Sequence, residues 1–457
     1  MRYATRRIAA ATLVVAAGAG GAVLTGRHRQ AARAEAAAAA ASRAAARVEA
    51  ERRDQEIALY DGARTTDAYS ATFPSRLAAL YLQRGRETGD FADVERAERE
   101  ARSSLALRTQ HNGGAFVLLA SSLLAQHRFS EARDVARQLV AGDPDVPAYR
   151  ALLGETQLEL GDYDGARAAF DSIPIDQRRS PSVAARLARW AELLGRDELA
   201  RSLLVTARAG ALADGRLPRE QAAWFALRLG DFDLRRGRLA SAERELADGL
   251  RAAPDDYRLL AALARLEALR RRWRQVVDCG DRSLASALDP ATLGLVSDAH
   301  AALGHAEEAS EYARAMEVAV LQQPGAFHRA WSLFLLDHAG PRGAGGGVVA
   351  AVLAKAEQEI VGRRDVYGYD LLAWALHHAG RDAEAREAMG HALALGTRDA
   401  ALYYHAGVIA AALGDAPAAR RDLSRALEIN PRFHHTQPAR ARAMLDSLDA
   451  LAVRQGD

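Results

Sequence analysis

Histidine is the residue type in this chain whose grouping first suggests chemistry. The 457 residues include 13 histidines, and eight of them form four sequence pairs: His300 with His305, His328 with His338, His377 with His378, and His434 with His435. A helical zinc site of the H-E-x-x-H type places two histidines four residues apart on one face, and none of these pairs has that spacing. We therefore expect histidines that are solvated or at helix ends. The alternative is an enzyme or metal-handling protein that uses the C-terminal histidines.

Two other segments could hold phosphate groups. The Gly-rich segment 340–347 lacks the G-K-[ST] ending of a phosphate-binding loop, and no strand is expected before it. The basic run RRRWR at 270–274 could contact a nucleic-acid backbone, but Trp273 stands where the repeats described below place a core aromatic residue. No Ser-His-Asp or Cys-His arrangement stands out. The sequence therefore predicts no enzyme, no cofactor, no metal and no nucleic-acid partner.

The composition favours a folded, helical chain. Apolar residues make up 49% and charged residues 26%, which is typical of a globular protein rather than a disordered one. Alanine, leucine and arginine dominate, and these residues have high helix propensity. The net charge of +2 produces no global field that would attract nucleic acid, and the single Cys279 excludes an internal disulfide framework.

The elements that must position these side chains repeat along the chain. Segments 366–396 and 401–431 each read as a helix, a short turn and a second helix, with the small residues Ala385 and Ala419 at matching places. Matching positions recur upstream at nearly the same step, with one longer step before Ala242, at Ala97, Ala132, Ala166, Ala200, Ala242, Val276 and Ala309. Small residues at fixed positions let paired helices touch. A helix–turn–helix unit with a period of about 34 residues therefore organises most of the chain.

The last of these units resembles the tetratricopeptide repeat (TPR). The residues that carry the resemblance are Tyr403, Gly407, Ala419, Leu423, Ala426 and Pro431. It implies an all-α, helical-hairpin solenoid, a right-handed superhelix of about ten helix pairs. We expect this solenoid over residues 58–435, followed by a C-terminal capping helix and tail over 436–457.

The resemblance also implies where a partner would bind. In this family the first helix of each unit lines a concave groove, and the matching positions here are Tyr367, Asp370, Trp374, His377, Tyr404, Arg258 and Arg265, with Glu155, Arg189 and Asp231 in the central units. Trp374 is also a candidate for packing between units. The lysine and asparagine of the family's two-carboxylate clamp are missing from these positions. We therefore expect a non-enzymatic scaffold or adaptor that binds a peptide or helix of a protein partner, with a self-assembling structural spacer as a further alternative.

The N-terminus predicts targeting to the cell envelope. Residues 1–30 carry Arg2, Arg6 and Arg7 before an uncharged run from Ile8 to Gly26, which suits either a cleaved signal peptide or an uncleaved membrane anchor. Residues 31–57 are Ala-rich and predict a spacer helix or a partly disordered linker. We expect a bacterial protein that is anchored or exported, to the periplasm or beyond, and that meets the membrane through this segment alone.

Overall fold

The computed structural model describes the backbone of residues 4–215, 217–321, 329–340 and 346–456, and the side chains of these residues except 4–32, 35, 214 and 451–456. All regular secondary structure in these ranges is helical. The expectation of an all-α fold is therefore confirmed.

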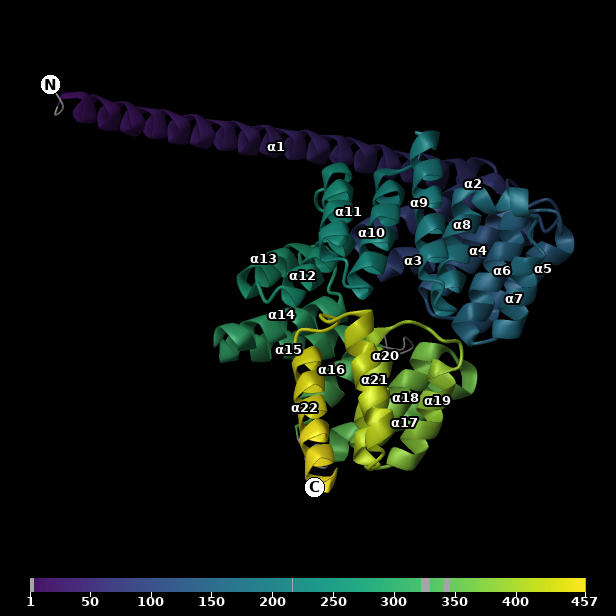
Figure 1. The fold of residues 1–457 in the computed structure, drawn as a ribbon. Coiled ribbons are helices and arrows are strands. Elements are labelled where there is room, and N and C mark those ends of the chain that lie inside the picture. The colour runs from purple at the N-terminus through teal and green to yellow at the C-terminus, as the bar shows by residue number, and fades with distance from the viewer. Residues whose placement is uncertain (1–3, 216, 322–328, 341–345, 457) are drawn as a thin grey trace.

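Ten helix pairs follow one another along the described chain (Figure 1). The first helices of the pairs are α2 (Thr72–Thr88), α4 (Gly113–Ala125), α6 (Pro147–Leu160), α8 (Pro181–Leu193), α10 (Arg219–Arg235), α12 (Tyr257–Leu269), α14 (Pro290–Leu303), α16 (Arg329–His338), α18 (Val366–His378) and α20 (Ala400–Ala412). The second helices are α3 (Phe91–Leu107), α5 (Phe129–Gly142), α7 (Tyr163–Asp171), α9 (Asp197–Asp214), α11 (Leu239–Ala252), α13 (Trp273–Leu284), α15 (Ala306–Leu321), α17 (Gly346–Gly362), α19 (Asp382–Leu393) and α21 (Ala416–Ile429). A short 3-10 helix, η1 (Ile175–Arg179), follows α7, and α22 (Gln437–Gly456) follows α21. The predicted number of pairs and the helix after them are both confirmed.

Small residues hold the two helices of each pair in contact. Eight of the nine repeat positions identified in the sequence are 0% exposed, and the ninth, Ala309, is half-buried. A Cβ atom added to Gly407 would lie 2.6 Å from Cγ of Leu423, and one added to Gly154 would lie 2.7 Å from the ring of Phe170. No real Cβ approaches that closely, so glycine at this position lets the second helix seat its large apolar side chain on the first.

Aspartates and glycines set the helix ends. Asp256, Asp289 and Asp399 each accept a hydrogen bond from a backbone N–H in the first turn of α12, α14 and α20. Such N-caps satisfy backbone donors that the helix leaves without partners. Gly161 and Gly304 end α6 and α14 with φ of 76° and 83°, a left-handed conformation that glycine adopts without strain.

Helix α1 (Ala4–Thr66) is a single continuous helix that extends away from the repeats at its N-terminal end (Figure 1). It continues to Thr66, so the first pair begins at Thr72 and not near residue 58 as expected. Residues 58–66 contain no proline and one glycine, so nothing in them stops the helix. From Ser42 onward α1 lies against the body: Ser42 Oγ donates to the carbonyl of Ala252 at 3.0 Å, and Arg43 pairs with Asp255 at 2.9 Å.

Residues 4–30 of the predicted targeting segment form the first part of α1, and residues 1–3 lie outside the described residues. The side chains of this segment lie outside the part of the chain whose side chains are described. Among the described residues, no helix combines the length and the apolar character that crossing a bilayer requires.

The solenoid curls until its last three pairs meet its middle pairs end-on. Arg364 N–H donates to the carbonyl of Leu160 at 3.1 Å, and Thr397 Oγ1 donates to the carbonyl of Leu193 at 2.6 Å. Asn430 Nδ2 donates to the carbonyls of Leu234 and Arg235 at 3.0 and 3.3 Å. The accepting residues end α6, α8 and α10, where a helix leaves carbonyls without partners.

Each of these contacts joins a loop of the C-terminal pairs to the end of a first helix in the middle pairs. The sequence separation of Thr397 and Leu193 is 204 residues, and that of Asn430 and Leu234 is 196. Both separations span about six repeat lengths. We call these three contacts the closure contacts.

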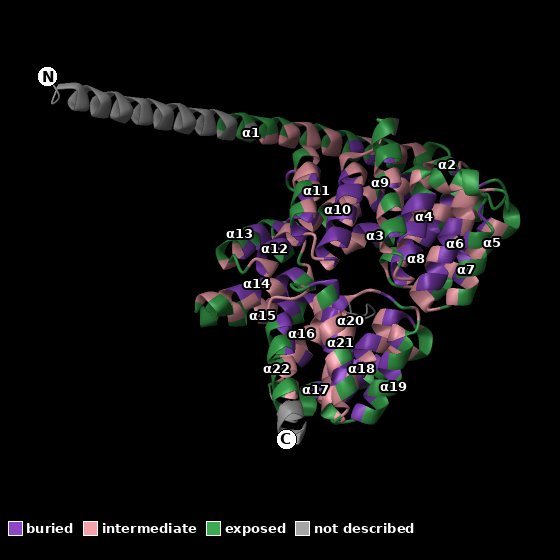
Figure 2. Cartoon of the chain, viewed as in Figure 1, coloured by how far each residue is buried: buried purple, intermediate pink, exposed green. Residues whose placement is uncertain are grey.

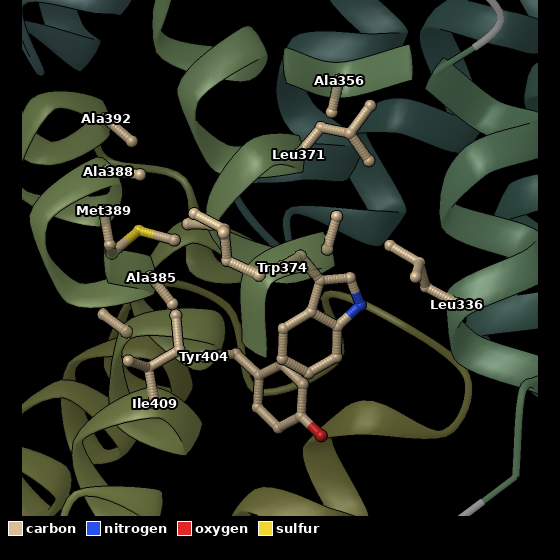
Figure 3. Packing of buried hydrophobic residues seen from close by; sticks show 14 of the residues in the cluster. Leu336, Ala356, Leu371, Trp374, Ala385, Ala388, Met389, Ala392, Tyr404 and Ile409 are labelled. Carbon is tan, nitrogen blue, oxygen red and sulfur yellow. The ribbon is translucent and has the colours of Figure 1, made fainter. Parts of the chain in front are cut away.

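The C-terminal pairs share one apolar core. Figure 3 shows the indole of Trp374 next to the phenol of Tyr404, with Leu336 beside them. Helix α22 adds Ala441 to this core and keeps much of its other face exposed (Figure 2). An exposed outer face is what a helix at the end of a repeat array requires.

Candidate partner-binding site

Three of the predicted groove residues are buried. Asp370, Trp374 and Tyr404 are 0%, 5% and 3% exposed, because α16 and α20 flank α18 on both sides. Trp374 stacks on His405 with ring centroids 4.1 Å apart, and His405 Nδ1 lies 2.7 Å from Asp370 Oδ1. These side chains hold neighbouring pairs together and are not open to a partner in this conformation.

The same contacts explain the electrostatics of Asp370. Burial alone would raise the pKa of this carboxyl, but His405 and the guanidinium of Arg329 outweigh burial and lower it. Asp370 is therefore a charged structural residue whose negative charge is compensated within the core by His405 and Arg329.

Two further predicted residues are half-buried. The ring of Tyr367 lies between two guanidiniums, with Arg189 and Arg329 at 5.3 and 5.2 Å from its centroid. Burial raises the pKa of its hydroxyl, which lies 3.3 Å from Asp399. His377 lies 2.7 Å from Asp382 and stacks against the indole of Trp374. Both predicted positions are already engaged by other parts of the array.

Arg258 and Arg265 lie on α12 and contact α10. Arg258 is 3.7 Å from Glu220, and Arg265, whose side chain is 51% exposed, is 2.6 Å from Asp231. Two more pairs of neighbouring first helices are joined in the same way, by Arg186 with Glu155 at 2.6 Å and by Arg235 with Glu192 at 2.8 Å. We call this series of contacts between successive first helices the ion-pair ladder.

A cavity of about 470 Å³ opens on the inner side of this ladder. Its lining comes entirely from the first helices α2, α6, α8 and α10: Arg86, Glu155, Leu158, Glu159, Pro181, Ser182, Ala185, Arg186, Arg189, Glu220, Gln221, Trp224, Phe225 and Arg228. Cavities of this size are in the range that holds small ligands or a short stretch of peptide. The first helices therefore form the inner face of the solenoid, as the resemblance implied.

Charged groups in and beside the cavity perturb one another. Burial alone would raise the pKa of Glu192, but Arg235 and Arg189 outweigh burial and hold it well below its usual range. Burial raises the pKa of Glu159, although Arg189 opposes this. Burial also lowers the pKa of Arg228, and the nearby charge of Arg235 lowers it further, against an opposing effect of Glu192. The surroundings therefore stabilise the charged form of Arg228 less than that of Arg189, whose pKa is raised because Tyr367, Glu192 and Glu159 outweigh its burial.

The sequence reading missed Arg228. The repeat register could have found it, because Arg228 follows Arg186 by the same step that separates Ala200 from Ala242. By that register Arg228 should meet the counterpart of Glu155 one repeat further on, and that counterpart is Arg189.

The histidines and the cysteine take structural roles among the described residues. Asp298 accepts hydrogen bonds from His338 at 2.8 Å and from His435 at 3.1 Å, which joins α14, α16 and the loop before α22. Burial raises the pKa of the Cys279 thiol to about 11. In the part of the chain that the structure describes, no group of three or more histidine, cysteine, aspartate or glutamate residues is placed to hold a metal ion.

Family comparison now adds to this geometry. Two family models, both described as tetratricopeptide repeat, match residues 123–190 and 400–433. The second match covers α20 and α21, the unit that carries the resemblance in the sequence. The chain therefore contains tetratricopeptide repeats.

Known proteins add little beyond the family. No curated protein sequence matches this chain. Similar solved structures include the type IV pilus biogenesis factor PilW, which is 19% identical. The match covers 50% of this chain and 99% of PilW, with a TM-score of 0.39. PilF of Pseudomonas aeruginosa is 16% identical; the match covers 52% of this chain and 99% of PilF, with a TM-score of 0.37. Yeast Tom70 is 10% identical; the match covers 92% of this chain and 97% of Tom70, with a TM-score of 0.36. At these TM-scores the likenesses support no argument about function.

TPR arrays generally serve as scaffolds that bind other proteins, and they do so with extended concave surfaces. Both matching family models describe repeats and not a catalytic domain. Of the predicted groove residues of this chain, Arg265 on α12 has an exposed side chain.

Proposed function

We propose that this chain is a non-enzymatic scaffold that holds an extended segment of a protein partner on the inner face of α6, α8, α10 and α12. The observations that carry the proposal are the cavity lined by α2, α6, α8 and α10 and the exposed Arg265 of α12, which pairs with Asp231 of α10. Arginine and aromatic side chains are the residues that most often anchor protein interfaces, and this face offers both, with Arg186 and Trp224 in the cavity.

The narrowness of the inner face supports an extended segment rather than a helix. Arg86 of α2 reaches across to Glu220 of α10 and pairs with it at 3.0 Å. A Cβ atom added to Gly89, directly after α2, would lie 2.4 Å from Cβ of Ala287, in the loop before α14. A helix with its side chains is about 10 Å wide, so it would have to break such contacts, whereas an extended chain would not.

The proposed setting is the bacterial cell envelope. The support comes from the sequence, in which the arginines of residues 1–7 precede the uncharged run from Ile8 to Gly26. Helix α1 then connects this segment to the repeats and docks on them through Ser42 and Arg43. Such a helix would hold the repeats at a set distance from a membrane.

Site-specific crosslinking in native cells tests the binding proposal. A photo-crosslinking residue replaces the exposed Arg265 on the inner face, and the matched control replaces the exposed Arg137 on the second helix α5. We expect a defined protein, identified by mass, to be captured at position 265 and not at position 137. Equal capture at both positions would contradict a groove partner, and capture of this chain alone would support the self-assembling spacer instead.

A further inference from the structure

Two arginines meet in the repeat register of the inner cavity. Arg186 of α8 meets Glu155 of α6. The equivalent contact one repeat further on would join Arg228 of α10 to residue 189 of α8, which is an arginine, so α8 and α10 are joined instead by Glu192 and Arg235. The repeat register thus places the guanidinium of Arg189 at the position that the carboxylates of Glu155 and Asp231 occupy in the neighbouring repeats.

In the described part of the chain no carboxylate lies within ion-pair distance of the Arg228 guanidinium, and Glu192 and Asp231 act on its charge only from farther away. Its guanidinium lies instead over the ring of Trp224, whose centroid is 5.9 Å from the guanidinium carbon. A guanidinium over an indole is stabilised by the ring, but the ring accepts none of its five N–H hydrogen bonds. The side chain is half-buried, so water satisfies these donors only in part.

We infer that the cavity between α6, α8 and α10 is a binding site for a single carboxylate group carried on an apolar body, with the guanidinium of Arg228 as its main ligand. Guanidinium and carboxylate match in geometry, because two parallel N–H groups can donate to the two carboxylate oxygens. The ligand then supplies to Arg228 the carboxylate that Glu155 supplies to Arg186.

The charge of the cavity fits one negative group. Its lining holds four arginines and three glutamates, which leaves an excess of one positive charge. Arg186 and Arg86 are already paired with Glu155 and Glu220. A polyanion such as a nucleic acid would meet the same three glutamates and be repelled, so the site suits a monoanion.

The uncharged part of the lining fits an apolar body. Trp224 and Phe225 form an edge-on aromatic pair with centroids 4.9 Å apart, and Leu158, Pro181 and Ala185 complete the apolar wall. A carboxylate that carries an aromatic or aliphatic group can therefore bury that group while Arg228 holds the charge. Polar anchors set in an apolar wall are typical of small-ligand sites.

This inference goes beyond the proposed scaffold. The carboxylate could belong to a free organic acid or to an acidic residue of a bound segment, and the experiment distinguishes these two sources. The probes are 3-phenylpropanoate for the free acid and an acetylated, amidated Gly-Phe-Asp-Gly peptide for the chain-borne group. Their neutral counterparts are 3-phenylpropanamide and the Gly-Phe-Asn-Gly peptide. Isothermal titration of the full chain with each of the four gives the affinities.

We expect saturable one-to-one binding of at least one carboxylate probe, and binding of its neutral counterpart that is weaker by about tenfold or more, because a hydrogen bond to a charged group is lost. Arg228→Gln should weaken the carboxylate probe by a similar factor. The matched control Arg137→Gln, which removes an exposed arginine from the second helix α5, should leave binding unchanged. Binding of the free acid and not the peptide assigns the site to a small molecule, and binding of the peptide assigns it to a partner segment.

Folding of the variant is checked separately. Arg228→Gln removes a half-buried charge without a carboxylate partner, so its melting temperature should stay the same or rise. Arg228→Lys keeps the charge but not the planar pair of donors, so it should bind with intermediate affinity. Equal binding by acid and amide, wild-type affinity in folded Arg228→Gln, or no binding of either carboxylate probe would overturn the inference. Each of these results leaves the crosslinking test at position 265 intact.

Discussion

Removing one closure contact should weaken the whole molecule. Asn430 is 0% exposed, and its Nδ2 donates to the carbonyls of Leu234 and Arg235 at the end of α10. Its Oδ1 also accepts from the backbone N–H of Arg432 at 2.9 Å. The variant Asn430→Ala deletes all three hydrogen bonds and leaves the backbone in place.

The size of the effect can be worked from these contacts. The carbonyl of Leu234 also accepts from Gly237 N–H, so it keeps one partner in the variant. The carbonyl of Arg235 loses its contact with Asn430, and an unsatisfied buried group costs about 1–3 kcal/mol. The bond to Leu234 adds roughly 1 kcal/mol, and the N–H of the exposed Arg432 can bond to water instead, so we expect the free energy of unfolding to fall by about 2–4 kcal/mol.

Urea unfolding followed by circular dichroism measures this change. We expect a lower midpoint for Asn430→Ala and, because the C-terminal pairs lose a connection to the middle pairs, a broader or two-step transition. The control Arg432→Ala changes an exposed side chain and should shift the stability by less than about 0.5 kcal/mol. Identical curves for wild type and Asn430→Ala would refute the view that the closure contacts stabilise the fold.

Three further changes test the packing and the charges. Ala419→Leu should overpack the contact between α20 and α21 and lower stability by about 1–3 kcal/mol, measured by thermal melting, and an unchanged melting curve would mean that the repeat register is wrong. Gly407→Ala should also destabilise, because its Cβ would lie 2.6 Å from Leu423, and crystallography or melting that shows no adjustment would contradict that contact. The hydrogen bond to Asp298 raises the pKa of His338, so the stabilisation from this pair is complete below about pH 6.5 and is lost as the pH rises through the raised pKa. We therefore expect the stability difference between wild type and His338→Gln to shrink as the pH rises from the acidic to the basic side of neutrality. A difference that stays constant over this range would exclude the linkage.

The helix pairs could be predicted from the sequence because each depends on residues close together in the chain. A small residue such as Ala419 and a large one such as Leu423 meet within one pair, so the repeat period is enough to place both. The N-terminal boundary was less accurate. Nothing near residue 58 signals an end to the helix, and α1 already packs against α2 there, with the ring of Tyr60 6.1 Å from that of Phe73.

The groove residues were harder to predict because their exposure depends on distant parts of the chain. Register alone places Trp374 and Tyr404 on the inner face, but the neighbouring pairs and α22 bury that part of it. The closure contacts join residues far apart in the sequence, and no local pattern marks Thr397 or Asn430 as partners of α8 and α10. Arg228, by contrast, was open to prediction from register and charge.

The closure contacts also bear on how the protein is made. In a simple repeat array each unit needs its neighbours alone, so units can fold in order as they leave the ribosome. Here Leu193 must wait for Thr397, 204 residues later, and at roughly 5–20 residues per second that delay is about 10–40 s. During that time the ends of α6, α8 and α10 lack their later partners. A partner or a chaperone present during synthesis therefore meets helix ends that the finished protein covers.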